Sequence, residues 1–358
     1  MYTPPPKIIL SRTDSIGDVV LTLPMAGLLK QLIPGCEVYF LGRAYTQGVA
    51  LCCTDVDRVI DFDALCGHPE QEQVEALKAL RADCIIHVLP NRHVARLAKA
   101  ARIPLRIGTT NRIFHWTTCN RLVKLSRKNS PLHEAQLNFM LARPLGAKPY
   151  YDVREVASML NFSAKALPLP LRGYLDGQRF NLVLHPKSKG SAREWGLDNF
   201  AQLVALLPPE QFKIFVTGTQ VEGDMVRDIL IAPYAGRVTD LTGKFSLDEL
   251  VAFLANVDGI VAASTGPLHI AAALGVNAVG VYPPIRPMHP GRWAPIGERA
   301  KVFAAQKECS ACRKSGQCLC MQEIKPVEVA KYLLERSSHP EASERKRKIK
   351  IIAEIPKI

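Results

Sequence analysis

The chain has no apolar run close to the ~20 residues that a helix needs to cross a bilayer. Its first seven residues, Met-Tyr-Thr-Pro-Pro-Pro-Lys, lack the charged and apolar regions of a signal peptide. Acidic residues (33) are fewer than basic ones (46), and aromatic residues make up only 7%. We therefore expect a cytoplasmic protein, and its positive charge predicts polyanionic partners.

Two common nucleotide-binding fingerprints are also missing. The loop after the first expected strand reads Ser11-Arg-Thr-Asp-Ser-Ile-Gly17 and not G-x-G-x-x-G, which disfavours a nicotinamide-dependent dehydrogenase. Gly243-Lys244 lacks the preceding glycine of a P-loop, which disfavours kinases and ATPases. No Asp-x-Asp pair occurs in the loops that we assign to the site, so we expect chemistry without a metal ion or other cofactor.

Part of the basic excess lies at the end of the chain. Residues 336–358 carry seven Lys or Arg against three Glu, with no aromatic residue among them. We expect a basic face near the interdomain cleft, assisted by residues 345–350, to hold the protein against an anionic membrane surface; the alternative for the tail is a merely solubilising charge. Because nucleic-acid binding favours aromatic residues between the cations, no nucleic-acid partner is expected.

Ten cysteines do not indicate disulfides in a cytoplasmic chain of this length. Six are scattered, several of them in apolar runs, and we interpret them as small core residues: Cys36, Cys52, Cys53, Cys66, Cys84 and Cys119. The other four, Cys309, Cys312, Cys318 and Cys320, have a second pair too close together for a usual zinc knuckle. Loop packing or an occasional disulfide is predicted in preference to zinc.

Strand-like and helix-like segments alternate in both halves of the chain, which predicts parallel sheets built from βαβ units. Expected strands cover 7–10, 37–41, 83–88, 104–107, 180–184, 213–216, 238–241, 259–263 and 278–282. Expected helices cover 18–32, 71–81, 93–101, 133–145, 197–207, 221–231, 246–256, 267–274 and 326–334. The alternation of strand-like and helix-like segments is interrupted between Tyr150 and Gly177. We predict two doubly wound Rossmann-like α/β domains facing across a cleft, residues 1–165 and 166–335, followed by the basic tail 336–358.

The most informative stretch is residues 259–269, Gly-Ile-Val-Ala-Ala-Ser-Thr-Gly-Pro-Leu-His. An apolar strand ends there in a small polar turn, and a helix begins near Pro267, where a missing N–H costs nothing. Free backbone N–H groups at such a helix start suit a phosphate. The alternative is that Ser264 or Thr265 merely caps a structural helix.

Two further loops of the second half carry polar groups at strand ends. Lys187, Lys189 and Arg193 stand among small residues after the strand 180–184, a composition typical of a diphosphate site. Gly218 and Glu222 follow the next strand, and a carboxylate there can accept hydrogen bonds from ribose hydroxyls. The alternatives are solvated surface charge for the cations and a first-turn helix acid for Glu222.

The first half offers an acid at the carboxyl end of its first strand, where open α/β sheets bind ligands. Asp18 follows Ser15 and Gly17, two small residues that would let a substrate come close. A carboxylate within hydrogen-bond reach of a substrate hydroxyl can deprotonate it. The alternative is an acid that only complements the dipole of the following helix.

Together these motifs resemble the heptosyltransferase family, bacterial lipopolysaccharide-core enzymes with a two-domain GT-B fold. The resemblance extends from Lys7 to about Leu334 and rests on segments 11–24, 106–108, 185–195, 218–222 and 264–275 in that order, with 320–324 as a further match. It implies an inverting glycosyltransferase that moves heptose or a related sugar from a nucleotide-diphosphate donor, ADP-heptose, to an anionic glycolipid acceptor. Such an enzyme would work in the cytoplasm, in peripheral contact with the inner membrane.

The resemblance also implies roles for individual residues. Asp18 would be the general base. Donor contacts would come from Lys189, Arg193, Thr217, Gly218, Glu222, Ser264, Thr265, Gly266, Pro267 and His269. Acceptor contacts would come from Arg12, Ser15, Gly17, Asn91 and Arg92.

Three departures from the family pattern lie in the donor half. Ser264 stands where many members have Asp, Gly196 stands where Pro is usual, and Tyr282-Pro-Pro-Ile285 replaces Phe-Gly-Pro-Thr. They leave the nucleotide and sugar less determined than the reaction class. The alternatives are therefore a transferase of the same family that uses another nucleotide sugar for a different surface glycan, a non-catalytic nucleotide- or polyanion-binding protein, and a sugar-epimerising relative.

Overall fold

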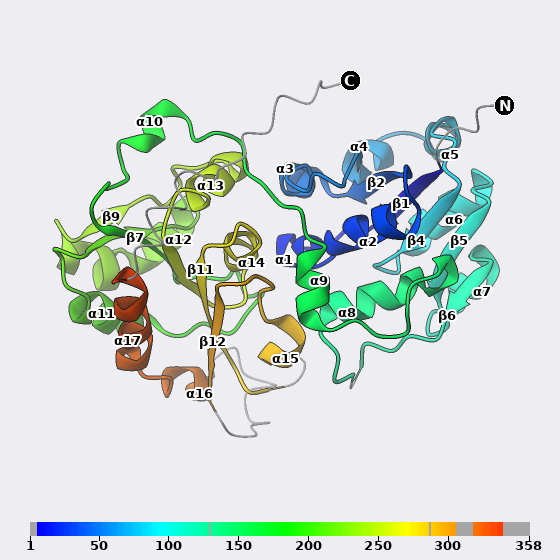
Figure 1. Ribbon diagram of the computed structural model, residues 1–358. Helices are drawn as coiled ribbons and strands as arrows, with labels where there is room; N and C mark the ends of the chain where they lie inside the picture. Colours follow the sequence, from blue (N-terminus) through cyan, green and yellow to red (C-terminus); the bar gives the residue numbers. More distant parts are fainter. Residues whose placement is uncertain (1–5, 129, 286–287, 306–317, 339–358) are drawn as a thin grey trace. The chain divides into compact units, whose positions relative to one another are not determined.

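The computed structural model describes residues 6–128, 130–285, 288–305 and 318–338. They form two compact units that divide between Phe162 and Ser163, within the stretch 150–177 where the sequence pattern of alternating strands and helices is interrupted. Each unit contains one six-stranded parallel sheet with helices on both faces (Figure 1). The predicted α/β architecture with two domains is thus confirmed.

Unit 1 has the strand order β3-β2-β1-β4-β5-β6. Its strands are β1 (Lys7–Ser11), β2 (Glu37–Gly42), β3 (Arg58–Asp61), β4 (Cys84–His87), β5 (Leu105–Thr109) and β6 (Arg121–Val123). Its α-helices are α1 (Ile16–Val20), α2 (Pro24–Leu32), α3 (Gln47–Ala50), α4 (Phe62–Cys66), α5 (Glu70–Ala79), α6 (Arg92–Ala100), α7 (Ile113–Thr118), α8 (Glu134–Phe139) and α9 (Val153–Ser158). Because β4 pairs with β1 and not with β3, the direction in which the sheet grows reverses between β1 and β4, a usual ligand position.

Alternate residues of the unit 1 strands face two different helix layers. On one face Ile9 and Ile85 pack with Leu77 of α5 and with Val94 and Leu97 of α6. Helices α2 and α8 contact each other, and α2 also contacts β2. Burial on both sides explains why the strands read as continuous apolar runs and not as alternating ones.

Unit 2 repeats this plan with the order β12-β11-β10-β7-β8-β9. Its strands are β7 (Phe180–His185), β8 (Phe212–Val216), β9 (Val238–Asp240), β10 (Gly259–Ala262), β11 (Asn277–Tyr282) and β12 (Ala300–Ala304). Its α-helices are α10 (Leu169–Arg172), α11 (Leu197–Leu206), α12 (Gln220–Val226), α13 (Leu247–Leu254), α14 (Gly266–Ala273), α15 (Pro290–Trp293), α16 (Leu319–Gln322) and α17 (Pro326–Ser337). The reversal here lies between β7 and β10.

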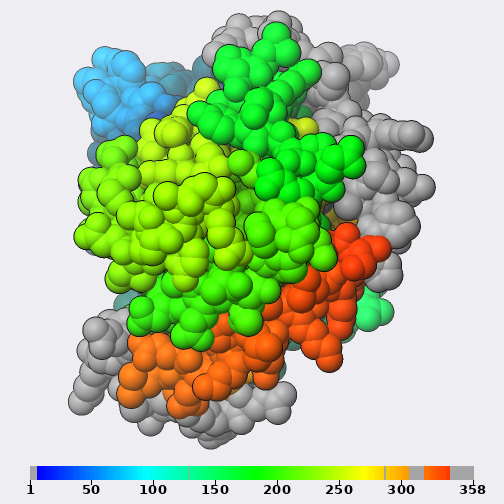
Figure 2. All heavy atoms as spheres, turned by 90° about the vertical axis from the view of Figure 1, so that its left-hand side faces the viewer, coloured from blue at the N-terminus to red at the C-terminus, as the bar shows by residue number. Residues whose placement is uncertain are grey.

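Helix α17 belongs to the body of unit 2. Its residues Val329 and Leu333 join Phe200 and Leu203 of α11 in one buried cluster over the sheet. Figure 2 shows α17, in red, lying on the surface beside green segments that precede it in the chain. Arg336, which we predicted in the basic tail, is the penultimate residue of this helix. The predicted tail beyond Ser338 lies outside the described residues.

Several predicted elements have different limits. The stretch 18–32 is two helices, α1 and α2, and Pro24 is the first residue of the second. The predicted helix 133–145 is α8 followed by the 3₁₀ helix η2 (Met140–Leu145), which contains Pro144. A π-helical turn, η3 (Arg227–Ile231), follows α12. The edge strands β3, β6 and β12 were not predicted, because each is only partly buried and contains a basic residue, Arg58, Arg121 or Lys301, that interrupts the apolar pattern.

The cysteine predictions are confirmed for five of the six scattered residues, which are buried: Cys36, Cys52, Cys53, Cys84 and Cys119. Cys66 was predicted wrongly, since it lies exposed at the last residue of α4. Cys318 and Cys320 are buried in unit 2, whereas Cys309 and Cys312 lie outside the described residues.

Within the described ranges, no group of three or more His, Cys, Asp or Glu side chains could hold a metal ion. No helix in those same ranges is long and apolar enough to span a membrane.

Candidate functional site

In unit 1, Asp18 is held by two neighbours at the reversal between β1 and β4. The loop after β1 leads into α1, where Asp18 stands in the first turn. One carboxylate oxygen accepts a hydrogen bond from the Arg12 guanidinium and the other accepts one from the Ser15 hydroxyl. The Asp18 side chain is 18% exposed, so it is fixed in orientation and still reaches solvent.

Arg12 is the centre of a buried ion network. Its side chain is 3% exposed and donates to both carboxylate oxygens of Asp14, at 2.8 and 3.0 Å. It also donates to Glu134 Oε1 at 3.1 Å. Burial disfavours the charged guanidinium, yet the three surrounding carboxylates raise the pKa of Arg12 above its ordinary value. Burial also raises the pKa of Asp14, against the opposing effect of Arg12.

A second layer from α8 holds this network in place. Glu134 is 1% exposed and accepts hydrogen bonds from both Arg12 and Arg127, the latter at 2.9 Å. Asn138, one turn later, accepts from Arg127 at 2.7 Å and donates to the carbonyl of Leu21 at 3.1 Å. The α8 side chains therefore connect the α1–α2 segment to the residue that orients Asp18.

The predicted acceptor residues take different positions in unit 1. Arg12 is not an exposed contact, because its guanidinium is buried among carboxylates. Asn91 is the N-cap of α6, accepting from the amides of His93 and Val94, and its amide nitrogen donates to Thr13 at 3.4 Å. Arg92 in the next position is exposed, as is Ser15 at the N-cap of α1.

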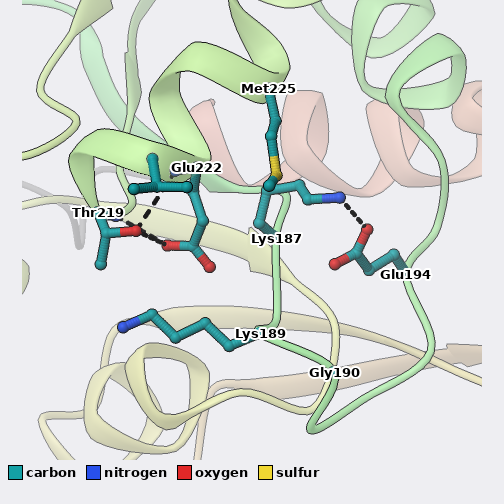
Figure 3. Close-up of a pocket in the computed structure, with 8 residues that line it drawn as sticks. Lys187, Lys189, Gly190, Glu194, Thr219, Glu222 and Met225 are labelled. Carbon is teal, nitrogen blue, oxygen red and sulfur yellow. Dashed lines mark hydrogen bonds and ion pairs between the residues drawn. The ribbon is translucent and has the colours of Figure 1, made fainter.

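In unit 2, three loops leave the carboxyl edge of neighbouring strands. Ala262 of β10 pairs with His185 of β7, and Leu184 pairs with Val216 of β8, so the loops after these strands start side by side. The loops after β7 and β8 line a cavity of about 560 Å³. Its lining residues, most of them labelled in Figure 3, are Lys187, Lys189, Gly190, Glu194, Thr219, Val221, Glu222 and Met225.

The cations of the loop after β7 differ in their partners. Lys187 pairs with Glu194 at 2.5 Å, and Glu194 also accepts from the amide of Ser188 at 3.0 Å. Lys189 is exposed and points away from that pair in Figure 3. Its φ of 49° lies in the left-handed region that non-glycine residues rarely adopt, and it precedes Gly190 with a φ of 80°. The backbone here turns tightly and exposes the Lys189 side chain.

The end of the same loop is anchored in the core. Trp195 is completely buried, and its indole N–H donates to the carbonyl of Ile324 at 2.9 Å. Arg193, two residues earlier, is half-buried. The anchor keeps the loop attached to the C-terminal part of unit 2.

Glu222 has one carboxylate oxygen engaged and one facing the cavity. Its Oε2 accepts from the Thr219 amide at 2.8 Å and from the Thr219 hydroxyl at 2.9 Å, in the capping box of α12. In Figure 3 the other carboxylate oxygen points away from Thr219, toward the side of the cavity where Lys189 lies. Glu222 can therefore serve both as the first-turn helix acid and as the ribose-binding carboxylate of the two interpretations above, because one oxygen caps the helix and the other can accept a hydrogen bond from a ligand.

His185 and Thr217 form the floor beside this acid. The His185 ring Nδ1 and the Thr217 hydroxyl are 3.0 Å apart, and both residues are buried. Burial lowers the pKa of His185 to about 4. The negative charge of Glu222 opposes this lowering of the pKa, and the positive charge of Lys189 adds to it. Gly218 continues the same turn, where a Cβ in place of its hydrogen would come within 3.2 Å of the Glu222 side chain.

The start of α14 is built as the sequence indicated. Thr265 is the N-cap without a side-chain cap bond, Gly266 begins the helix and Pro267 lies in its first turn. The buried Thr265 hydroxyl has no hydrogen-bond partner within the described part of the chain. Ser264 hydrogen-bonds to the hydroxyl of Tyr282, while His269 is buried in the helix. Unsatisfied amides and a hydroxyl at a helix start are groups that a phosphate can accept from.

Sequence reasoning missed several residues of these sites. Glu134, Arg127 and Asn138 lie more than 100 residues from Arg12 along the chain, and nothing in their local pattern points to it. Val221 and Met225 were hidden inside an ordinary helical pattern. The available signal was that the two residues are four positions apart, because this spacing places both side chains on one face of α12.

Comparison with known proteins agrees with this geometry. Residues 72–321 match the model of glycosyltransferase family 9 (heptosyltransferase), more than half of the chain. A putative glycosyltransferase of Haemophilus influenzae is 27% identical, covering 83% of this chain and 88% of that protein. Lipopolysaccharide core heptosyltransferase OpsX of the same organism is 20% identical over 86% of this chain and 87% of its own length.

Solved structures share the fold. A family 9 glycosyltransferase from Veillonella parvula superimposes with a TM-score of 0.78 at 18% identity, covering 94% of this chain and 98% of that one. The ADP-heptose lipopolysaccharide heptosyltransferase II of Escherichia coli gives 0.71 at 19% identity, covering 93% and 98%. With the family model spanning parts of both units, the chain belongs to glycosyltransferase family 9, the heptosyltransferase family, and is a glycosyltransferase.

Proposed function

We propose that this enzyme transfers heptose from ADP-heptose to an anionic glycolipid acceptor of the lipopolysaccharide core, with inversion at the anomeric carbon. The observation that carries the proposal is the Asp18 carboxylate, held by a buried arginine and still 18% exposed. Several relatives are named lipopolysaccharide heptosyltransferases, which supports the same substrate class.

Asp18 acts as the general base in this proposal. Its carboxylate takes the proton of the acceptor hydroxyl while the hydroxyl oxygen forms the new bond to the anomeric carbon. The bond from that carbon to the diphosphate oxygen breaks, and ADP leaves with the electron pair. Arg12 is a positioning residue, because it holds one oxygen of Asp18 and does not itself reach solvent. Ser15 and Gly17, with Asn91 and Arg92, border the acceptor.

Unit 2 binds the donor. The apolar side chains of Val221 and Met225, 64% and 59% exposed, offer a surface for the nucleobase. The cavity-facing oxygen of Glu222 accepts from ribose hydroxyls beside Thr217 and Gly218. Lys189 and Arg193, with the start of α14 at Ser264, Thr265, Gly266, Pro267 and His269, stabilise the departing diphosphate. This charge stabilisation is the work that a metal ion does in other transferases.

The proposed place of action is the cytoplasmic face of the inner membrane, in peripheral contact with it. A glycolipid acceptor is anchored in the bilayer, so the enzyme must meet it at that surface. The excess of basic over acidic residues favours an anionic surface.

A donor panel tests the proposal. The purified protein is mixed with ADP-heptose, UDP-glucose or GDP-mannose, with and without a core glycolipid that lacks heptose, and the released nucleoside diphosphate is measured. We expect ADP release only when donor and acceptor are both present, and at least about tenfold tighter binding of ADP than of UDP or GDP. No ADP release from ADP-heptose in the presence of the core glycolipid would overturn the proposed reaction.

A second candidate is a transferase of the same family that uses another nucleotide sugar for a different surface glycan. It is favoured by Ser264, which stands where many members of the family have Asp. Its hydroxyl forms a hydrogen bond with the Tyr282 hydroxyl, so the carboxylate charge is absent from this position. Preferential binding and release of UDP or GDP in the same panel would support this candidate over the first.

A further inference from the structure

Unit 1 contains a long stretch without negative charge. Between Asp83 and Glu134 there is no Asp or Glu, whereas ten residues are Lys or Arg. This one segment therefore contributes +10, most of the net charge of +13. It includes α6, β5, α7 and β6, which lie together at one side of unit 1 (Figure 1).

Two large apolar side chains protrude from the middle of this segment. Ile113 and Trp116 of α7 are 89% and 63% exposed. The indole N–H of Trp116 donates to the carbonyl of Thr110 at 2.9 Å. Because this bond satisfies the only polar atom of the ring, the exposed part of Trp116 is apolar and fixed in direction. The buried His115 holds the other side of α7 to the unit, because its Nδ1 accepts from the Thr109 amide at 2.9 Å and its ring lies 5.4 Å from that of His87.

Cations surround these two side chains. Arg112 is the exposed N-cap residue of α7. Lys99, near the end of α6, donates to the carbonyl of Thr117 at 2.8 Å, which places its ammonium group against α7. Lys124 follows Val123, whose carbonyl accepts from the amide of Thr110, the residue that holds Trp116. We call Ile113, Trp116, Lys99, Arg112 and Lys124 the α7 patch.

We propose that the α7 patch is a membrane-docking surface whose partner is an anionic phospholipid bilayer. Ile113 and Trp116 enter the interface between headgroups and acyl chains, a preferred position of tryptophan. Lys99, Arg112 and Lys124 meet the lipid phosphates. Helix α7 has six residues, so docking requires the apolar and the charged contacts together.

The chemistry of the patch favours a bilayer over a nucleic acid. Its most exposed apolar side chain is the aliphatic Ile113, which cannot stack on a base, whereas burial in acyl chains suits it. The patch shares no residue with those assigned to the reaction. It contributes attachment to the surface, and the inference holds whichever sugar the enzyme transfers.

Vesicle sedimentation of the full chain tests the inference, without donor or acceptor present. Phosphatidylglycerol–phosphatidylcholine vesicles are compared with vesicles of phosphatidylcholine alone. We expect the double variant Ile113→Ser/Trp116→Ser to bind the anionic vesicles at least about tenfold more weakly than the wild type does. The matched control Leu169→Ser/Val327→Ser removes two exposed apolar side chains of unit 2, 75% and 57% exposed, and should bind like the wild type.

Charge is tested separately. Arg112→Glu/Lys124→Glu should weaken binding about tenfold or more. The control Lys325→Glu/Lys331→Glu, at the N-cap and on the exposed face of α17, should change it less than about threefold. Removal of residues 339–358 measures the rival contribution of the basic tail. Binding that depends wholly on the tail and not on the α7 patch would overturn the inference.

A fluorescence readout keeps the test independent of folding defects. Of the three tryptophans, Trp195 is buried and Trp293 is half-buried, whereas Trp116 is 63% exposed. In the Trp293→Phe background, Trp116 should therefore dominate a blue shift of the emission when anionic vesicles are added, and Trp116→Phe should abolish the shift while retaining binding. Equal vesicle binding by the Ile113→Ser/Trp116→Ser variant would contradict docking. Salt-sensitive binding of single-stranded oligonucleotides, lost in the same variants, would assign the patch to nucleic acid instead.

Discussion

The two units share one sheet order but fill the reversal point of that sheet in opposite ways. In unit 1 the loop after β1 carries Arg12, whose guanidinium is buried against three carboxylates. In unit 2 the corresponding loop after β7 borders a cavity of about 560 Å³, with Lys189 exposed at its edge. In both units the strand order places a loop at the reversal point of the sheet. The side chains of that loop determine whether it holds a buried ion network or borders a cavity.

The difference follows from what each unit is proposed to hold. A general base must be oriented before its substrate arrives, and the ion network of unit 1 does this with groups of the protein itself. A diphosphate brings its own negative charge, so unit 2 requires donors that are not already paired. Lys187 shows the contrast within one loop, because its ion pair with Glu194 stabilises the loop and leaves Lys189 for a ligand.

The largest expected effect is on the buried network of unit 1. Glu134→Ala leaves the buried Arg12 guanidinium without one of its carboxylate partners, which should lower the free energy of unfolding by about 3–5 kcal/mol. Urea denaturation monitored by circular dichroism measures the loss. Glu75→Ala, which breaks an exposed pair with Lys78, is the control and should cost less than about 1 kcal/mol. Similar losses of unfolding free energy in both variants would contradict the claim that the buried ion network stabilises the fold more than an exposed ion pair does.

A smaller effect is expected from pH, through His185 in unit 2. Its pKa is about 4 in the folded protein, below the ordinary value of 6.5, so the unfolded chain takes up a proton first as the pH falls. Stability should decrease between about pH 6.5 and pH 4, by about 2 kcal/mol from pH 7 to pH 5 for this group alone. His87 in unit 1, with a pKa of about 3, adds to the same trend. His185→Gln should flatten the measured pH dependence, and an unchanged slope would contradict the assignment.

The smallest expected effect is on nucleotide binding in unit 2. Glu222→Gln keeps an oxygen for the capping box of α12 and removes the charge that faces the cavity. We expect ADP to bind about tenfold more weakly, with little change in the melting temperature. Isothermal titration calorimetry measures the affinity, with Glu328→Gln on α17 as the matched control. Unchanged ADP affinity would remove Glu222 from the donor site.

Much of both sheets could be predicted from local pattern, because buried parallel strands read as apolar runs. The start of α14 at Gly266 was also visible, since a strand, a small polar turn and an early proline are all local signals. The burial of Arg12 was not, because its partner Glu134 is 122 residues away in sequence. The pairing of Lys187 with Glu194 was equally hidden, since the composition of a loop does not say which charges face each other.

The most direct test of the account compares turnover and nucleotide affinity in Asp18→Asn. This variant can still accept a hydrogen bond from Arg12 but cannot take the proton of the acceptor. We predict a fall of kcat by about 10²–10⁴ with the Kd for ADP unchanged, because base and donor pocket belong to different units. Near-normal turnover would contradict the assignment of the base, and a parallel loss of ADP affinity would contradict the division of labour between the two units.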